Sequence, residues 1–180
     1  EGFDWLYAYD GNGNITNITD ALNGHYVMTY GPRNERTLER NQDNFEWHYA
    51  YDELLRLKTQ QDPNGTTRTL DYDAGGRVLS VTFNTGRVNA FAYDDNNNPE
   101  VLTRTGSGPP TLRQLRYDLM DRVTECTDAF SKKVRYAYDA LGRVSILTYP
   151  DGKTLTHGYD ALNRLTNQVD WAGRQMTYAY

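Results

Sequence analysis

The chain has 180 residues, a net charge of -5 and an apolar content of 38%, below the roughly 45–50% of typical globular domains, so a thick two-sided core is not expected. Charges of both signs are mixed without a basic patch, which argues against nucleic acid or an anionic membrane surface as a partner. No apolar run reaches the roughly 18 residues of a membrane helix, and the single cysteine, Cys126, excludes a disulfide framework.

A tyrosine recurs along the whole chain and divides it into repeats. The interval is 21 residues, with one interval of 24, and the markers are Tyr9, Tyr30, Tyr51, Tyr72, Tyr93, Tyr117, Tyr138, Tyr159 and Tyr180. A fixed period of this length predicts a repeat architecture. Because the chain begins at Glu1 without a methionine and stops on a marker tyrosine, we interpret residues 1–180 as an array of about eight units from a longer protein.

Each unit begins with a short Asp-to-Arg segment. Aspartate follows the marker tyrosine in seven of the eight full units, and arginine stands five residues after it at Arg56, Arg77, Arg122, Arg143 and Arg164. A branched apolar residue comes next, such as Val144. An aspartate side chain can bond backbone N–H groups two residues on, so this segment predicts a turn.

The rest of each unit is typical of a β-hairpin. In the unit from Tyr138, one strand is predicted from about Val144 to Tyr149 and another from about Lys153 to Tyr159. Between them, Asp151-Gly152 predicts a two-residue turn with positive φ at both residues, which pairs Val144 with Tyr159. The preceding turn also puts Val144 near Tyr138.

These hairpins predict an all-β fold. No segment has a sustained 3.6-residue periodicity, so almost no helix is expected. About fifteen or sixteen strands follow as tandem antiparallel hairpins in one long sheet, which should curve into an open shell or a superhelical ribbon because flat sheets beyond roughly 10 strands curl. One face carries tyrosines and branched residues, and the other carries small or polar residues such as Ala137.

Two units depart from the pattern. The unit from Tyr30 has Gly31 in place of aspartate and the charged Arg36 in the branched apolar position. The unit from Tyr93 carries three extra residues, which we place as a loop insertion at 106–110, where the sequence is rich in glycine and proline.

The pattern Tyr-Asp-x-x-Gly-Arg-branched resembles the YD-repeat, or RHS-repeat, family, most sharply at 72–78, 138–144 and 159–165, and the resemblance covers the whole chain. It implies a hollow β-sheet shell, which in bacterial polymorphic toxins and toxin complexes encloses a C-terminal toxin and in teneurins serves cell adhesion. It also implies a secreted or cell-surface location, with a bacterial source favoured. The family's C-terminal core segment and a toxin domain do not occur in this sequence, so no protease or toxin residue is assigned.

No residue is predicted to be catalytic, to bind a cofactor or to bind a metal. His25, His48 and His157 lie at different phases of the repeat, whereas a repeated metal site would use one phase. The segment from Asp10 begins like a calcium loop, but Ile15 stands where such a loop needs glycine. The Asp–Arg pairs recur in similar settings, which favours a structural role over acid–base chemistry.

Two functions are consistent with the sequence. The first is a non-catalytic structural shell segment, not an enzyme, that helps to enclose a C-terminal toxin or other cargo, with the adjoining repeats and that enclosed domain as partners. The alternative is a carbohydrate-binding or cell-surface adhesion module, because aromatic rings stack on sugar faces. Neither predicts membrane insertion. Open sheet edges also predict edge-to-edge self-association of the isolated chain.

Overall fold

The computed structural model describes residues 4–106 and 108–180. These residues form seventeen strands and no helix, which confirms the all-β prediction and exceeds the expected fifteen or sixteen strands. None of the described residues lies in a helix that could cross a membrane. The chain divides into two units, Glu1–Asn89 and Ala90–Tyr180, which are described separately below.

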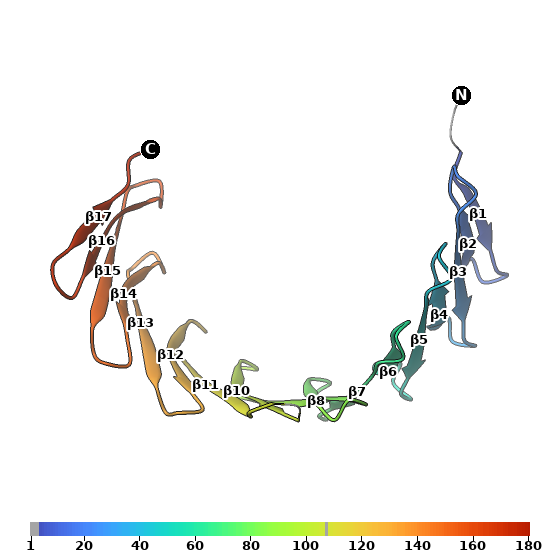
Figure 1. The fold of residues 1–180 in the computed structure, drawn as a ribbon, viewed down its shortest axis with the longest axis horizontal. Coiled ribbons are helices and arrows are strands. Elements are labelled where there is room, and N and C mark those ends of the chain that lie inside the picture. Colours follow the sequence, from blue (N-terminus) through green and yellow to red (C-terminus); the bar gives the residue numbers. More distant parts are fainter. Residues whose placement is uncertain (1–3, 107) are drawn as a thin grey trace. The chain divides into compact units, whose positions relative to one another are not determined.

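In both units the strands follow one another in chain order (Figure 1). The first unit contains β1 (Leu6–Tyr9), β2 (Ile15–Thr19), β3 (His25–Tyr30), β4 (Arg36–Arg40), β5 (Glu46–Tyr51), β6 (Leu57–Gln61), β7 (Thr67–Tyr72) and β8 (Val78–Phe83). Strand β9 (Val88–Tyr93) contains the boundary between the units. The second unit contains β10 (Pro99–Thr105), β11 (Thr111–Tyr117), β12 (Val123–Asp128), β13 (Lys133–Tyr138), β14 (Val144–Thr148), β15 (Thr154–Tyr159), β16 (Leu165–Asp170) and β17 (Gln175–Thr177).

Within each unit, each strand is hydrogen-bonded to the next one along the chain. In the first unit the antiparallel pairs run in succession from β1–β2 to β7–β8. In the second unit they run from β10–β11 to β16–β17. The predicted loop insertion at 106–110 lies between β10 and β11, and its Ser107 lies outside the described residues. The tandem antiparallel hairpins are therefore confirmed.

The two turns of a repeat have the same backbone. In the first turn, Asp139 N donates to Arg143 O over 2.9 Å and Gly142 N donates to Asp139 O over 3.0 Å. In the second turn, Tyr149 N donates to Lys153 O over 2.8 Å and Gly152 N donates to Tyr149 O over 2.9 Å. Gly142 has φ 80° and Gly152 has φ 84°, so each loop has three residues and places its last residue in the left-handed region.

The predicted two-residue turn at Asp151-Gly152 is wrong. Only Gly152 of this pair has a positive φ, and the third loop residue moves the register by one position. Ile146 is therefore opposite Thr156, whereas pairing Val144 with Tyr159 would put Ile146 opposite His157. The other prediction for this strand is confirmed, because Val144 lies opposite Tyr138 across a β-bulge.

The sheet is thin, as the apolar content predicts. Among the described residues no apolar side chain is buried, and the one buried polar residue is Thr19, at 8% exposure. Tyr138 and Tyr159 are half-buried, whereas Ala137 and Ile146, which face each other on the opposite side, are exposed. The tyrosine side is called the aromatic face below. Stability must depend on contacts between neighbouring strands and turns, since no second layer covers the described sheet of either unit (Figure 1).

Candidate functional site

The first turn of each repeat is capped by its aspartate. In the turn from Asp139, carboxylate oxygen Oδ1 accepts the backbone N–H of Leu141 over 2.9 Å and that of Arg143 over 3.0 Å. The other oxygen, Oδ2, accepts from Arg143 Nε over 2.7 Å. The structure thus confirms the predicted role of this aspartate in shaping the turn. The arginine closes the turn from the other side.

The same ion pair recurs at the first turns of other repeats. Its N–O distance is 2.6–2.7 Å in the pairs Asp52–Arg56, Asp73–Arg77, Asp118–Arg122 and Asp160–Arg164. A second turn also has this pair, at Asp170–Arg174, with a distance of 2.6 Å. The recurrence shows that the pair belongs to the repeat and not to one specialised place.

Four of the first-turn arginines also contact the marker tyrosine of the following repeat. The Arg143 guanidinium carbon lies 4.6 Å from the centroid of the Tyr159 ring, and the Tyr159 hydroxyl donates to Val144 O over 2.9 Å. The corresponding arginine-to-ring distances are 4.5–4.7 Å for Arg56–Tyr72, Arg122–Tyr138 and Arg164–Tyr180. We call Asp139, Arg143, Tyr159 and their equivalents the Asp–Arg–Tyr joint, because this contact connects successive repeats.

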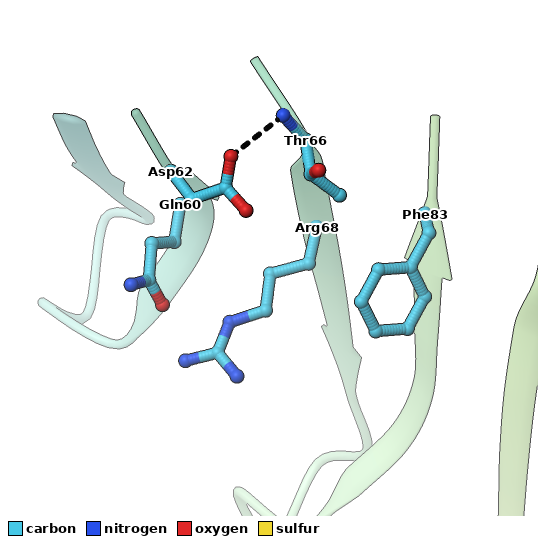
Figure 2. A pocket seen from close by; sticks show the side chains of 5 residues that line it. All are labelled: Gln60, Asp62, Thr66, Arg68 and Phe83. Carbon is cyan, nitrogen blue, oxygen red and sulfur yellow. Dashed lines mark hydrogen bonds between the residues drawn. The ribbon is translucent and has the colours of Figure 1, made fainter. Parts of the chain in front are cut away.

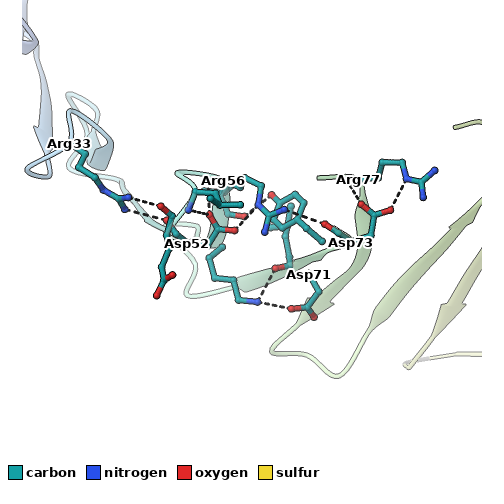
Figure 3. A network of polar contacts seen from close by, with 12 residues as sticks. Arg33, Asp52, Arg56, Asp71, Asp73 and Arg77 are labelled. Carbon is teal, nitrogen blue, oxygen red and sulfur yellow. Dashed lines mark hydrogen bonds and ion pairs between the residues drawn. The ribbon is translucent and has the colours of Figure 1, made fainter. Parts of the chain in front are cut away.

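Further hydrogen bonds connect neighbouring first turns (Figure 3). Arg33 Nη1 donates to Glu53 O over 2.8 Å, and Arg56 Nη1 reaches Asp73 O over 3.4 Å. In the second unit, Arg143 Nη1 donates to Asn163 Oδ1 over 2.9 Å. These connections and the arginine–tyrosine contact were not predicted from the sequence. The signal was present as the constant spacing of 16 residues from each arginine to the later tyrosine.

The turn at Gly31 lacks the capping aspartate but has the same backbone conformation, and the carboxylate of another residue replaces the missing one. Gly31 N donates to Glu35 O over 2.8 Å, as in the other turns. The Glu35 side chain accepts the backbone N–H of Arg33 over 2.8 Å. The charged Arg36 pairs with Glu39 over 3.0 Å and lies 5.1 Å from the Tyr49 ring centroid. The repeat therefore tolerates changes of residue while its turn geometry persists.

The environment of the joint keeps its aspartates ionised. Hydrogen bonds from Arg143, first from its backbone N–H and then from its side chain, hold the pKa of Asp139 below its usual value. The side-chain hydrogen bond from Arg77 is the main cause of the same lowering at Asp73. Burial raises the pKa of Tyr138. Similar shifts recur along the array, so they describe a structural ion pair and do not single out a catalytic group.

The other candidate residues remain scattered. His25 Nδ1 lies 3.2 Å from Thr19 Oγ1, and His48 Nε2 lies 3.3 Å from Glu46. His157 lies on β15, and its buried Nδ1 has no hydrogen-bond partner within the described part of the chain. The described residues include no group of three or more His, Cys, Asp or Glu side chains that could hold a metal ion. Asp10 Oδ1 accepts the backbone N–H groups of Asn12 and Asn14, as in the other first turns.

Comparison with known proteins identifies the family of this chain. A family model described as teneurin YD-shell matches residues 40–180. The chain belongs to the teneurin YD-shell family. The RHS-type resemblance of the sequence is thereby confirmed at the family level.

Curated relatives of this YD-shell chain come from animals and bacteria. Mouse teneurin-4 is 32% identical over 126 residues, which cover 67% of this chain and 4% of teneurin-4. A probable deoxyribonuclease, RhsA of Dickeya dadantii, is 31% identical over 86 residues, which cover 47% of this chain and 6% of RhsA. The YD-shell chain therefore spans a small part of the length of these relatives.

A solved structure shows the same fold. The crystal structure of TcdB2-TccC3 matches 94% of this chain and 12% of its own, with a TM-score of 0.77 and 12% sequence identity. At this identity the match supports the fold alone. It agrees with the antiparallel hairpins described above and confirms the predicted fold class.

Proposed function

We propose that this chain is a non-catalytic wall segment of a secreted or cell-surface YD/RHS shell, which helps to enclose a C-terminal toxin or other cargo. The observation that carries the proposal is the recurrent Asp–Arg–Tyr joint. Its charged and aromatic groups are engaged within their own turn or with the next repeat, as Arg143 is with Asp139 and with Tyr159. Groups engaged in this way build a continuous wall and are not free to react with a substrate.

The match to TcdB2-TccC3 and the relationship to RhsA support a wall of this kind. Adjoining repeats would extend the sheet at both ends, because within the described residues β1 pairs with β2 alone and β17 with β16 alone. The enclosed partner would be a domain elsewhere in the same protein. A bacterial source fits the relationship to RhsA.

Limited proteolysis of the full-length protein tests the enclosure. The segment that follows the array should resist a protease in the native protein. Replacing the joint arginines Arg122, Arg143 and Arg164 with alanine should open the wall and make that segment cleavable. A segment that is cleaved equally fast in both proteins would contradict enclosure. Replacing the exposed Arg113 with alanine provides a control, because this arginine has no contact in a joint.

The alternative predicted from the sequence, carbohydrate binding, requires a place where the wall departs from its pattern and offers unoccupied polar groups beside an aromatic ring. One such place exists in the first unit. It is considered separately because it neither requires nor excludes a wall role.

A further inference from the structure

Two second turns begin with an aromatic residue. In five other repeats this position is held by Asp20, Asn41, Asp62, Asp128 and Asp170. Phe83 and Tyr149 replace it, although the backbone of the Phe83 turn is retained, with Phe83 N donating to Arg87 O over 2.8 Å. An aromatic side chain cannot accept the backbone N–H groups that an aspartate caps. The turn therefore gives no reason for phenylalanine at this position.

Phe83 borders a hollow on the aromatic face of the first unit (Figure 2). Gln60, Arg68 and Phe83 lie directly opposite one another on β6, β7 and β8, so their side chains share that face. Asp62 and Thr66 complete the lining, and the cavity volume is about 240 Å³. Figure 2 shows Arg68 extending between Gln60 and the Phe83 ring. This volume is below the roughly 300–1,000 Å³ of sites for drug-sized ligands, and it suits a single small ring.

Arg68 occupies a mostly apolar position of the repeat. The equivalent residues Tyr26, Trp47, Val134, Leu155 and Met176 are apolar or aromatic, whereas Asn89 and Arg113 are polar. Arg113 lies opposite Asp128 on the next strand, so of these two arginines only Arg68 lies opposite an aromatic residue at that place, Phe83. The Arg68 side chain has no hydrogen bond or ion pair to any of the described residues, in contrast to the joint arginines. Three of the residues lining the hollow thus combine a free guanidinium, the amide of Gln60 and an aromatic ring. Departures from the repeat that gather at one place mark a functional site more readily than departures that are scattered.

A second cation lies beside the same ring. The Arg87 guanidinium carbon is 3.7 Å from the Phe83 ring centroid, and its buried Nε has no hydrogen-bond partner among the described residues. In the joint, the corresponding nitrogen of Arg143 bonds to Asp139, but Phe83 offers no carboxylate. The one carboxylate in the lining, Asp62, uses Oδ1 to accept the N–H groups of Asn64 and Thr66. The hollow therefore has an excess of positive charge.

We propose that this hollow binds an acidic sugar residue of the hexuronic acid type. The Arg68 guanidinium matches the sugar carboxylate, with which it can form two parallel hydrogen bonds. The apolar C–H face of the pyranose packs against Phe83. The Gln60 amide can donate hydrogen bonds to the ring hydroxyls or accept them. Oδ2 of Asp62, for which no hydrogen bond occurs among the described residues, can accept from a hydroxyl.

A sugar suits this lining better than an acidic peptide. Hydroxyl groups donate hydrogen bonds, which the Asp62 carboxylate can accept. A peptide carboxylate held by Arg68 would use neither Gln60 nor the flat Phe83 ring, and further acidic groups would be repelled by Asp62. The acidic sugar uses the guanidinium, the amide, the carboxylate and the ring together.

Isothermal titration calorimetry of the full chain with methyl glucuronide tests the proposal, with methyl glucoside as the neutral comparison. We expect the glucuronide to bind and the glucoside to bind at least about tenfold more weakly, because the charge-assisted hydrogen bonds are lost. Arg68→Leu and Phe83→Asp should each reduce glucuronide affinity about tenfold or more. The matched control is Arg113→Leu, which changes the same repeat position on β11 and should leave affinity unchanged.

Arg68→Leu and Phe83→Asp introduce residues that other repeats carry at the same positions, namely Leu155 and Asp62. The fold should therefore be retained. The melting temperature checks this, and Arg68→Lys, which keeps the charge without the planar fork, should give intermediate affinity. Equal binding of the two sugars, tighter binding of N-acetylglutamate amide as a peptide probe, unchanged affinity in the Arg68 variants, or no binding would each overturn the proposal. Protease resistance should be unaffected by Arg68→Leu, which separates this test from that of the wall.

Discussion

The two turns of the repeat that begins at Tyr138 have one backbone and two different sets of side-chain contacts. In the first turn, Asp139 caps the backbone and pairs with Arg143, which stacks on Tyr159. In the second turn, Tyr149 takes the place of the capping residue, although the backbone hydrogen bonds are almost the same length. The turn therefore depends on the left-handed residue at its fourth position, whereas connection to the next repeat depends on the side chains of the first turn.

The second turns accordingly vary more in their contacts. Lys153 pairs with Asp151 over 3.0 Å and lies 4.7 Å from the ring centroid of Trp171. At Phe83 the capping aspartate is also absent, and Arg87 stacks on the aromatic ring. The edge formed by the first turns thus maintains the array, and the other edge can change its residues. Five experiments test this difference between the two edges.

Acid should have the largest effect, because it acts on several first turns together. Hydrogen bonds lower the folded-state pKa values of Asp73, Asp118 and Asp139, so the unfolded chain takes up protons first as the pH falls. The stabilisation is present above the unfolded value of about 3.9 and is lost as the pH falls through the lower folded values. Melting temperatures measured from pH 7 to pH 2 should fall steeply below about pH 4. A constant melting temperature over this range would contradict a structural role for these carboxylates.

Leucine at the left-handed position should destabilise both turns equally. Gly142 and Gly152 have φ values of 80° and 84°, a region that costs an ordinary side chain about 1–2 kcal/mol. Gly142→Leu and Gly152→Leu should each lower the free energy of unfolding by this amount, as measured with urea. A much smaller effect at one turn would show that the two backbones are not equivalent.

Replacing Leu55 with glycine, the reverse of the substitutions above, should stabilise the chain. This leucine has φ 62° at the position where Gly142 stands in its repeat, so Leu55→Gly should raise the free energy of unfolding by about 1 kcal/mol. The adjacent Leu54 is 73% exposed and is not among the described residues with positive φ. Leu54→Gly is the control and should give no gain. If both variants lose stability, strain at Leu55 is not the controlling factor.

Much of this organisation was predictable from the sequence. The spacing of Tyr138 and Tyr159 predicted the repeat and its strands, and the chemistry of Asp139 predicted the capped turn. The register between β14 and β15 was not, because Asp-Gly was interpreted as a two-residue turn and the positive φ is confined to Gly152. The spacing of 10 or 11 residues between successive Gly and Asn residues, such as Gly142, Gly152 and Asn163, held the missing signal.

The stacking of Arg143 on Tyr159 was missed for a different physical reason. It joins two side chains across neighbouring turns, so it depends on the position of one hairpin relative to the next. Local propensities describe single hairpins and contain no information about that distance. For the same reason, the sequence alone could not predict that Arg68 lacks the contacts that the joint arginines make.

The tyrosine hydroxyl should have a modest effect. Tyr159 donates to Val144 O over 2.9 Å, so Tyr159→Phe should cost about 0.5–1.5 kcal/mol of unfolding free energy. Tyr136, on β13, also lies on the aromatic face, and its hydroxyl has no hydrogen-bond partner among the described residues. Tyr136→Phe should therefore leave the free energy of unfolding almost unchanged. Equal losses from the two variants, measured by urea denaturation, would show that this hydrogen bond is unimportant.

A double-mutant cycle between Arg143 and Tyr159 tests most directly whether the joint connects successive repeats. The free energies of unfolding would be measured for Arg143→Ala, Tyr159→Leu, the double variant and the unaltered chain. A guanidinium 4.6 Å from the ring centroid predicts a favourable coupling of about 0.5–1 kcal/mol. Arg143 with Tyr136 gives the control cycle, which should show additive effects. Additive effects for Arg143 with Tyr159 would contradict the joint.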